Sequence, residues 1–241
     1  MNTYNDFNNY NFNDYELESV NEAHMPVLIL ADTSGSMSGT PIINLNKAIN
    51  RFSADVCRDP RAASQVDVAV MGFNHATNVQ QDWRPVNKLD PVSFNAGGGT
   101  NLGDALEKGV EMLRKQGHRY ANEGIETRMP YMILISDGYG GDVSRAAELI
   151  RKRTDERKMR LWVLAVKGYD KATIAQLTDG KRVFELRDED GFDFTEFFDF
   201  MAASVKAVST SSPDQQVHID TKIGTEGSNC KVPDLDAWLN D

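Results

Sequence analysis

The stretch MPVLILADTSGSMSG, residues 25–39, places an apolar run directly before one aspartate and a series of serines and glycines. Residues 27–31 have the length and composition of a buried β-strand. Asp32, Ser34 and Ser36 follow at alternate positions, so their side chains point the same way if the loop is extended. Asp, Ser and Gly also favour turns. Taken alone, the stretch is therefore equally compatible with an ordinary loop between a strand and a helix.

On both sides of this stretch, short apolar runs alternate with amphipathic helical patterns. The pattern predicts strands at 27–31, 66–74, 77–83, 131–136, 161–166 and 183–187. It predicts two helices that begin at 40–41 and near 102, and three more that span about 143–153, 172–177 and 194–205. The strand at 77–83 is expected to pair with 66–74 through a tight turn. The alternation predicts an α/β fold with a doubly wound, mostly parallel central sheet and helices on both faces.

Two helix starts have recognisable capping residues. Thr40 and Pro41 suit the N-cap and the first helical position of one helix. Asn101 and Asp104 are placed to cap the helix near residue 102 reciprocally, as a weak form of the capping box.

Length and charge divide the chain into three parts. The 241 residues suffice for one α/β domain, which we assign to residues 25–208. Residues 1–24 form an arm rich in Asn and Tyr, with five acidic and no basic side chains, and we expect it to be disordered. Residues 209–241 form an acidic tail with an apolar group at Leu235, Trp238 and Leu239, which suggests a docking segment.

Composition excludes several classes of protein. The net charge is −10, and nearly all of it lies in the two ends, so residues 25–208 lack the basic face of a nucleic-acid-binding protein. The one basic run, residues 151–160, sits where a helix is expected to end and suits a solvated face. No apolar stretch approaches the ~20 residues of a membrane span, and the start does not read as a signal peptide. Cys57 and Cys230 have no metal-ligand spacing, so a cytoplasmic protein without disulfides is expected.

Oxygen-bearing side chains follow two of the predicted strands and precede one helix. Asp32 and Asp137 each end a buried strand, and Thr100 ends a glycine-rich loop. Because ligands of doubly wound sheets bind beyond the carboxyl ends of the strands, these residues should meet Ser34 and Ser36 there, outside the core. Two carboxylates and three hydroxyls suit Mg²⁺, with Mn²⁺ or Ca²⁺ as alternatives, and do not suit zinc or copper.

The same residues resemble a known site. DTSGSMSG, the Thr100 of GGGTNLGDAL and the Asp137 of ISDG are similar, in order and spacing, to the three parts of the metal-ion-dependent adhesion site of von Willebrand factor A domains. The resemblance implies that Ser34, Ser36 and Thr100 offer hydroxyl oxygens, with the two serines as direct ligands. It implies that Asp32 and Asp137 bind the metal directly or through water, and that a protein partner supplies an acidic residue to the remaining position.

Within this family, SGSMSGTPIINLNKAI and GGTNLGDAL look most like the bacterial TerY-like branch, which is linked to tellurite resistance. This resemblance implies a non-enzymatic module in a cytoplasmic stress-response or phage-defence assembly with a kinase and a PP2C-type phosphatase. Many relatives carry Pro and Thr after the strand-terminal Asp-Gly, whereas this chain has Tyr139-Gly140-Gly141-Asp142. Since that loop lines the rim of the site, the departure concerns the identity of the partner.

Two other interpretations remain open at this point. In the first, the chain is a Mg²⁺-dependent phosphoryl hydrolase with a strand-end aspartate as nucleophile. However, the haloacid-dehalogenase pattern needs a second carboxylate where Ser34 stands, and no Lys or Arg clamp is evident. The histidines, at positions 24, 75, 118 and 218, suit surface or structural roles rather than a general base. In the second, the oxygen-rich loops only cap strands and helices and bind nothing.

Overall fold

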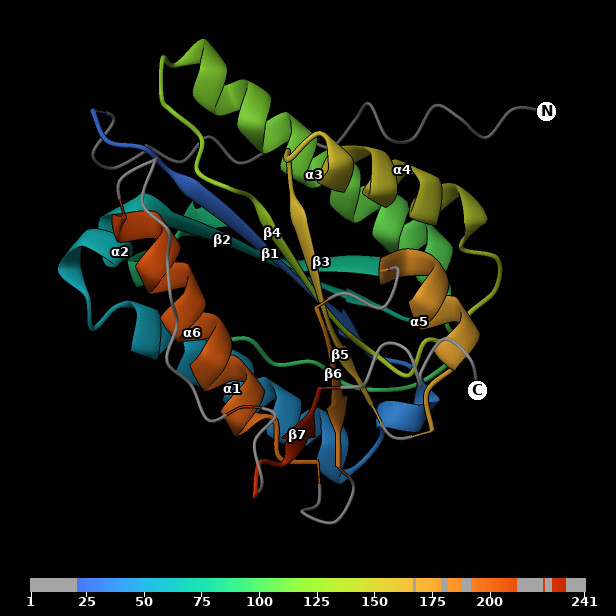
Figure 1. The fold of residues 1–241 in the computed structure, drawn as a ribbon. Helices are drawn as coiled ribbons and strands as arrows, with labels where there is room; N and C mark the ends of the chain where they lie inside the picture. Colours follow the sequence, from blue (N-terminus) through green and yellow to red (C-terminus); the bar gives the residue numbers. More distant parts are fainter. Residues whose placement is uncertain are drawn as a thin grey trace.

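A seven-stranded sheet forms the centre of the protein (Figure 1). The computed structural model describes residues 21–166, 168–178, 182–187, 192–211, 223 and 227–232. Within these residues the strand order is β3-β2-β1-β4-β5-β6-β7. The strands are β1 (Met25–Asp32), β2 (Val66–Phe73), β3 (Thr77–Pro85), β4 (Tyr131–Ser136), β5 (Arg160–Ala165), β6 (Val183–Leu186) and β7 (Cys230–Lys231).

The five inner strands are parallel, and each edge strand is antiparallel to its neighbour. β3 pairs with β2 at one edge, and β7 pairs with β6 at the other. Every residue of β1, β2 and β4 is buried, as expected for parallel strands covered on both faces. The predicted strands are confirmed, and β1 is longer than expected, since it extends from Met25 through Asp32.

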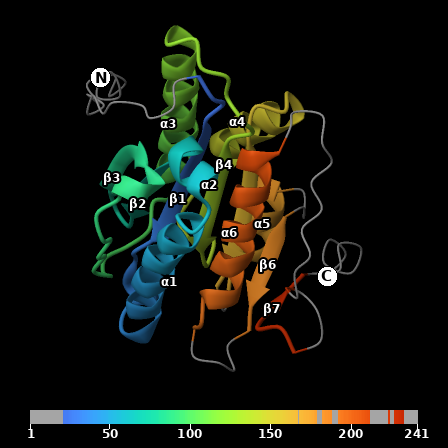
Figure 2. The ribbon, with the colours of Figure 1, turned by 90° about the vertical axis from the view of Figure 1, so that its left-hand side faces the viewer.

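Within the part of the chain that the structure describes, six α-helices cover the two faces of the sheet (Figure 1, Figure 2). One face carries α1 (Thr40–Val56), α2 (Pro60–Gln65) and α6 (Thr195–Thr210), and the other carries α3 (Leu102–Asn122), α4 (Ser144–Asp155) and α5 (Lys171–Thr178). Alternate β1 residues therefore enter different cores, with Ile29 in the cluster under α1 and α6 and Leu30 in the cluster under α3 and α4. This confirms the predicted doubly wound α/β fold.

The winding reverses at β1. This strand pairs with β2 on one side and with β4 on the other, so the chain builds the sheet outward in both directions from it. The carboxyl ends of β1 and β4 therefore flank the topological switch point, where open α/β sheets bind their ligands. Asp32 ends β1, and Asp137 follows β4.

Some local expectations were wrong. The N-cap of α1 is Gly39 and not Thr40, which is the first helical residue. The capping of α3 is one-sided: Asn101 accepts a hydrogen bond from the Asp104 amide, while the Asp104 carboxylate lies 3.0 Å from Lys108 Nζ. The reason is that Lys108 stands one turn further along the same helix face and competes for the carboxylate.

One α-helix and one strand were not predicted. α2 is a short helix whose N-cap is Asp59, and the Asp59 side chain accepts from the amides of Arg61 and Ala62. β7 has only two residues. The basic run at 151–160 contains the end of α4 and the start of β5, and most of its charged side chains are exposed as expected.

Most of the predicted arm and tail lies outside the described residues, including all of 1–20, 212–222 and 233–241. The expected disorder of the arm and the suggested docking segment around Trp238 fall in these ranges. Among the described residues, no helix is long and apolar enough to cross a membrane.

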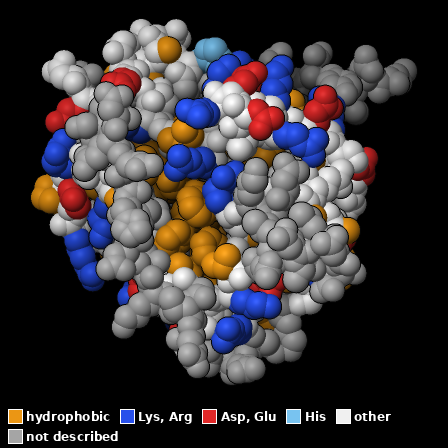
Figure 3. Space-filling model, in the orientation of Figure 1, with side chains coloured by type: hydrophobic (Ala, Val, Ile, Leu, Met, Phe, Trp, Pro, Cys, Tyr) orange, Lys and Arg blue, Asp and Glu red, His pale blue; other side chains and the backbone are white. Residues whose placement is uncertain are grey.

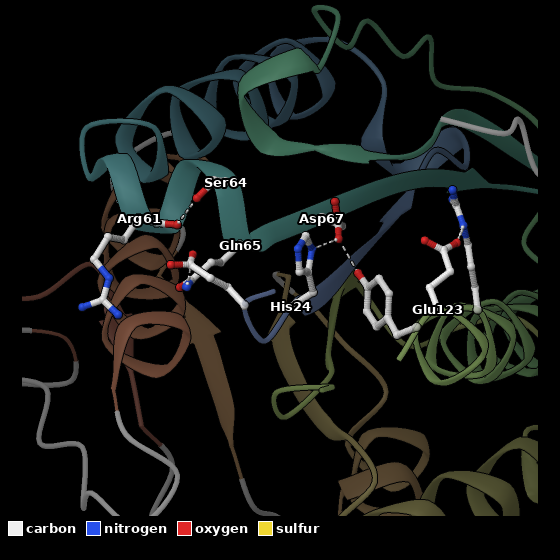
Figure 4. Close-up of polar contacts among 9 residues, drawn as sticks. His24, Arg61, Ser64, Gln65, Asp67 and Glu123 are labelled. Atoms are coloured by element: carbon white, nitrogen blue, oxygen red, sulfur yellow. Dashed lines mark hydrogen bonds and ion pairs between the residues drawn. The ribbon is translucent and has the colours of Figure 1, made fainter. Parts of the chain in front are cut away.

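A buried polar cluster ties the start of β1 to β2 and α3 (Figure 4). His24 Nδ1 lies 2.8 Å from Asp67 Oδ2, and the Tyr120 hydroxyl donates to the same carboxylate oxygen. All three residues are fully buried. His24 is thus a structural histidine, as predicted. His75 and His118 are exposed, as that prediction allowed, and His218 lies outside the described residues.

This cluster predicts a large effect of removing its carboxylate. Asp67→Ala deletes the acceptor that His24 and Tyr120 share, and breaking a buried polar pair from one side typically costs about 3 kcal/mol. Tyr120→Phe removes one hydrogen bond and should cost about 1 kcal/mol. Urea unfolding followed by circular dichroism measures both values. An Asp67→Ala loss no larger than that of Tyr120→Phe would contradict a shared, structurally important acceptor.

Candidate metal centre

Asp32 is held in one position at the end of β1. Its Oδ1 accepts a hydrogen bond from the Ser34 amide at 2.9 Å, and its Oδ2 accepts from Ser136 Oγ at 2.8 Å. Burial raises the pKa of this carboxyl above its usual range, the hydrogen bonds from Ser34 and Ser136 oppose the rise, and the nearby charge of Asp137 adds to it. Asp32 and Ser34 are both buried, so the expectation that all site residues lie outside the core was wrong for these two.

Ser34 and Ser36 join the β1 loop to the β4 loop. Their hydroxyl oxygens lie 3.0 Å apart, and Ser36 Oγ donates to Asp137 Oδ2 at 2.8 Å. Asp137 Oδ1 accepts from the Tyr139 amide, which fixes the carboxylate from the other side. Residues 101 positions apart in the sequence are thus directly bonded.

The loop that ends at Thr100 packs against both of these segments. The Gly35 amide donates to Gly98 O at 3.0 Å, and the Gly97 amide donates to Thr33 O at 2.8 Å. Next to Thr100, the Leu102 amide donates to Gly140 O at 3.1 Å. The structure therefore brings together the three segments that contain Asp32, Ser34, Ser36, Thr100 and Asp137. Within the described chain, the Thr100 hydroxyl makes no hydrogen bond to the other four side chains.

The spacing of the oxygens suits a small octahedral ion. Mg²⁺ binds oxygen at 2.0–2.1 Å in near-ideal octahedral geometry, which sets neighbouring ligands about 2.9 Å apart. The Ser34–Ser36 and Ser36–Asp137 oxygen pairs lie at 3.0 and 2.8 Å. The two oxygens of each pair are hydrogen-bonded to each other. Because their separations match those of neighbouring Mg²⁺ ligands, the oxygens would need to move little to bind one ion. Ca²⁺, at 2.3–2.6 Å from its ligands, needs wider spacing.

The donor set depends on hydroxyl groups. Among the described residues, no group of three His, Cys, Asp or Glu side chains is placed to hold a metal ion. At this site only Asp32 and Asp137 are ionisable, so these residues lack the Cys and His ligands of a typical zinc site, and their oxygen atoms suit a hard cation.

A model of the von Willebrand factor type A domain matches residues 27–199, more than half of the chain. The chain belongs to the von Willebrand factor type A domain family. No curated protein matches the chain.

Solved structures share the fold of this von Willebrand factor A chain. The pilus adhesin SpaC from Lactobacillus rhamnosus GG, in an open conformation, is 13% identical with a TM-score of 0.61, and the match covers 78% of this chain. The chain spans only 30% of the length of SpaC. The von Willebrand factor domain of the type V pili tip protein Mfa5 from Porphyromonas gingivalis is 10% identical with a TM-score of 0.60, covering 80% of this chain and 99% of that one. At these identities the likeness shows the fold alone.

Sequence analysis missed the residues that support the site from behind. Ser136 stands directly before Asp137 in the ISDG motif and holds Asp32 from the neighbouring strand. Thr33 is also buried, and its hydroxyl donates to Phe73 O on β2. A small hydroxyl residue beside each aspartate was the available signal. It could not be interpreted without the strand pairing.

Two adjacent glycines after β4 provide a matched pair of tests. Both have positive φ, 144° at Gly140 and 89° at Gly141, so an alanine at either position is strained. A Cβ at Gly140 would also lie 2.8 Å from Thr100 Cγ2, whereas one at Gly141 has no neighbour within 4 Å. We expect Gly141→Ala to cost about 1 kcal/mol of unfolding free energy and Gly140→Ala at least twice as much. Equal losses in urea unfolding would contradict the packing of Gly140 against Thr100.

Proposed function

We propose that this domain is a non-enzymatic protein-binding module that depends on a divalent metal. Its proposed ligands are Asp32, Ser34, Ser36, Thr100 and Asp137. The observation that most supports the proposal is the chain of hydrogen bonds from Ser34 through Ser36 to Asp137. Its oxygen–oxygen distances suit neighbouring ligands of Mg²⁺. Mg²⁺ is the proposed ion, and Mn²⁺ or Ca²⁺ could replace it.

The chemistry of these side chains favours capture of a carboxylate. Three of the five ligands are neutral hydroxyls, so they cancel none of the charge of a divalent cation. When bound, the ion would supply a positive centre that accepts an acidic side chain of a partner protein. Tyr139, with 55% of its surface exposed, lies two residues after Asp137 and is available for contact with that partner.

The arrangement offers little to a phosphoryl hydrolase, the alternative function. In the described chain, no Lys, Arg or His side chain makes a hydrogen bond or ion pair with any of the five proposed ligands, and a developing phosphoryl charge needs such a clamp. Asp32 is buried and accepts two hydrogen bonds, which leaves it poorly placed as a nucleophile. A Mg²⁺-dependent phosphatase activity that Asp32→Asn abolishes would favour the alternative.

The proposed setting is a cytoplasmic stress-response or phage-defence assembly with a kinase and a PP2C-type phosphatase as partners. It rests on the resemblance of residues 34–49 and 98–106 to the TerY-like branch. We propose neither a nucleic-acid nor a membrane partner, because the domain between the acidic ends is almost neutral.

Calorimetric titration with Mg²⁺ and Mn²⁺ tests the metal site. We expect Ser34→Ala and Ser36→Ala to weaken binding at least tenfold, because each removes one proposed ligand oxygen and no apolar side chain. Ser38→Ala is the matched control, since this exposed serine lies in the same loop and is not a proposed ligand. We expect it to bind like the unaltered protein. Unfolding curves check that all three variants fold. Unchanged affinity in both Ser34→Ala and Ser36→Ala would overturn the assignment.

A further inference from the structure

A partly exposed aromatic surface lies where α6 meets β5 and β6. The rings of Trp162 and Phe184 stack, with centroids 6.2 Å apart and planes 16° apart. Phe200 contacts both, with its centroid 5.5 Å from Trp162 and 5.2 Å from Phe184. Trp162 and Phe200 are only half-buried. Hydrophobic side chains gather at this part of the face, and Lys and Arg side chains border them (Figure 3).

Two arginines stand on the same face of the sheet as these rings. Alternation along β5 sets Arg160 on the face of Trp162. Arg182 directly precedes β6, and both guanidinium groups lie near the Tyr131 hydroxyl of the same core: burial raises the pKa of that hydroxyl, and the two positive charges oppose the rise. Burial, and then repulsion by Arg160, lowers the pKa of the Arg182 guanidinium. Its Nε donates to Leu161 O at 3.1 Å. Within the described residues, neither guanidinium forms an ion pair with a carboxylate, so the surface is both apolar and positively charged.

The chain returns to this surface through β7. This strand is antiparallel to β6, with Lys231 opposite Glu185 and Cys230 opposite Leu186. Cys230 is fully buried in the same core as Leu186, and burial raises the pKa of its thiol to about 12. The strand is therefore anchored. Val232, the last residue described, is 52% exposed.

The register of β7 determines where the following residues would go. β6 begins at Val183, and Arg182 has a positive φ of 58°. The antiparallel ladder can therefore extend only two residues beyond Lys231, to Pro233 opposite Val183. Asp234 then follows at the end of β6, next to Arg182. A further extended course would carry Trp238 about 20 Å beyond Phe184, so the chain has to turn back after Asp236 for Trp238 to reach the aromatic surface. Pro233 fits at a sheet edge, because its missing amide need not bond there.

We propose that residues 233–241, PDLDAWLND, dock within the same chain at the end of β6. Asp234 and Asp236 lie against the two arginines, and the chain then turns back so that Trp238 covers the aromatic surface. The segment has three aspartates and no basic residue, which complements the positive charge of Arg160 and Arg182 beside Trp162. Nine residues span up to about 30 Å, and the segment begins at the adjacent strand.

Hydrogen exchange with mass spectrometry tests the docking on the full chain. We expect amides of residues 234–240 to exchange at least tenfold more slowly than in the isolated peptide. Asp234→Arg and Arg182→Glu should each abolish this protection and speed exchange in β6. The double variant Asp234→Arg/Arg182→Glu should restore protection, because it re-forms the pair with the charges exchanged. Arg61→Glu, the same change at an exposed site on α2, is the control and should leave exchange unchanged.

Each other result overturns the proposal. Exchange of 234–240 at the rate of the free peptide would show that the segment does not dock on its own chain, and would leave it available to a partner. Protection that rises with protein concentration, together with a dimer in sedimentation, would show docking on a second copy. Protection that survives Asp234→Arg would place the segment elsewhere. Arg182 also donates to Leu161 O, so Arg182→Glu could destabilise the fold. If that variant does not fold, the result for Asp234→Arg alone decides the test.

Discussion

The buried carboxylate of Asp32 is the interaction on which the rest of the site depends. It lies at the point where the winding of the sheet reverses, and it accepts hydrogen bonds from its own loop and from Ser136 on β4. Hydrogen bonds to a charged group contribute about 1.5–3 kcal/mol each, and without them the buried charge would be costly. Asp32 therefore locks the β1 loop in the conformation that sets Ser34 and Ser36 beside Asp137.

The fold explains why such a site forms at this place. Parallel strands with helices on both faces bring the ends of β1 and β4 to one edge, and the loop before α3 closes over them through the Gly35–Gly98 backbone bond. At the opposite end of β1, the buried His24–Asp67–Tyr120 cluster ties the strand to β2 and α3. Both ends of the central strand are thus fixed by buried carboxylates. Of the two, only Asp32 lies beside the other proposed metal ligands.

Much of this architecture could be predicted from the sequence, for physical reasons. Strands buried on both faces must be continuous apolar runs, so residues 27–31 and 131–136 were unambiguous, and the aspartates that end them marked the site. What could not be predicted depends on contacts between distant segments. The role of Ser136 requires knowing that β4 lies beside β1. β7 has two residues and no periodicity, and the surface formed by Trp162, Phe184 and Phe200 combines three elements. The signal for α2 was present in Asp59-Pro60 and was overlooked.

A crystal structure of the full chain grown with Mn²⁺, using anomalous scattering to locate the ion, tests the central claim most directly. The account predicts one strong anomalous peak within bonding distance of Ser34 Oγ and Ser36 Oγ, with Asp32, Thr100 and Asp137 around it, directly or through water. Ordered loops at these five residues with no anomalous peak between them, at a Mn²⁺ concentration that saturates binding in solution, would contradict it.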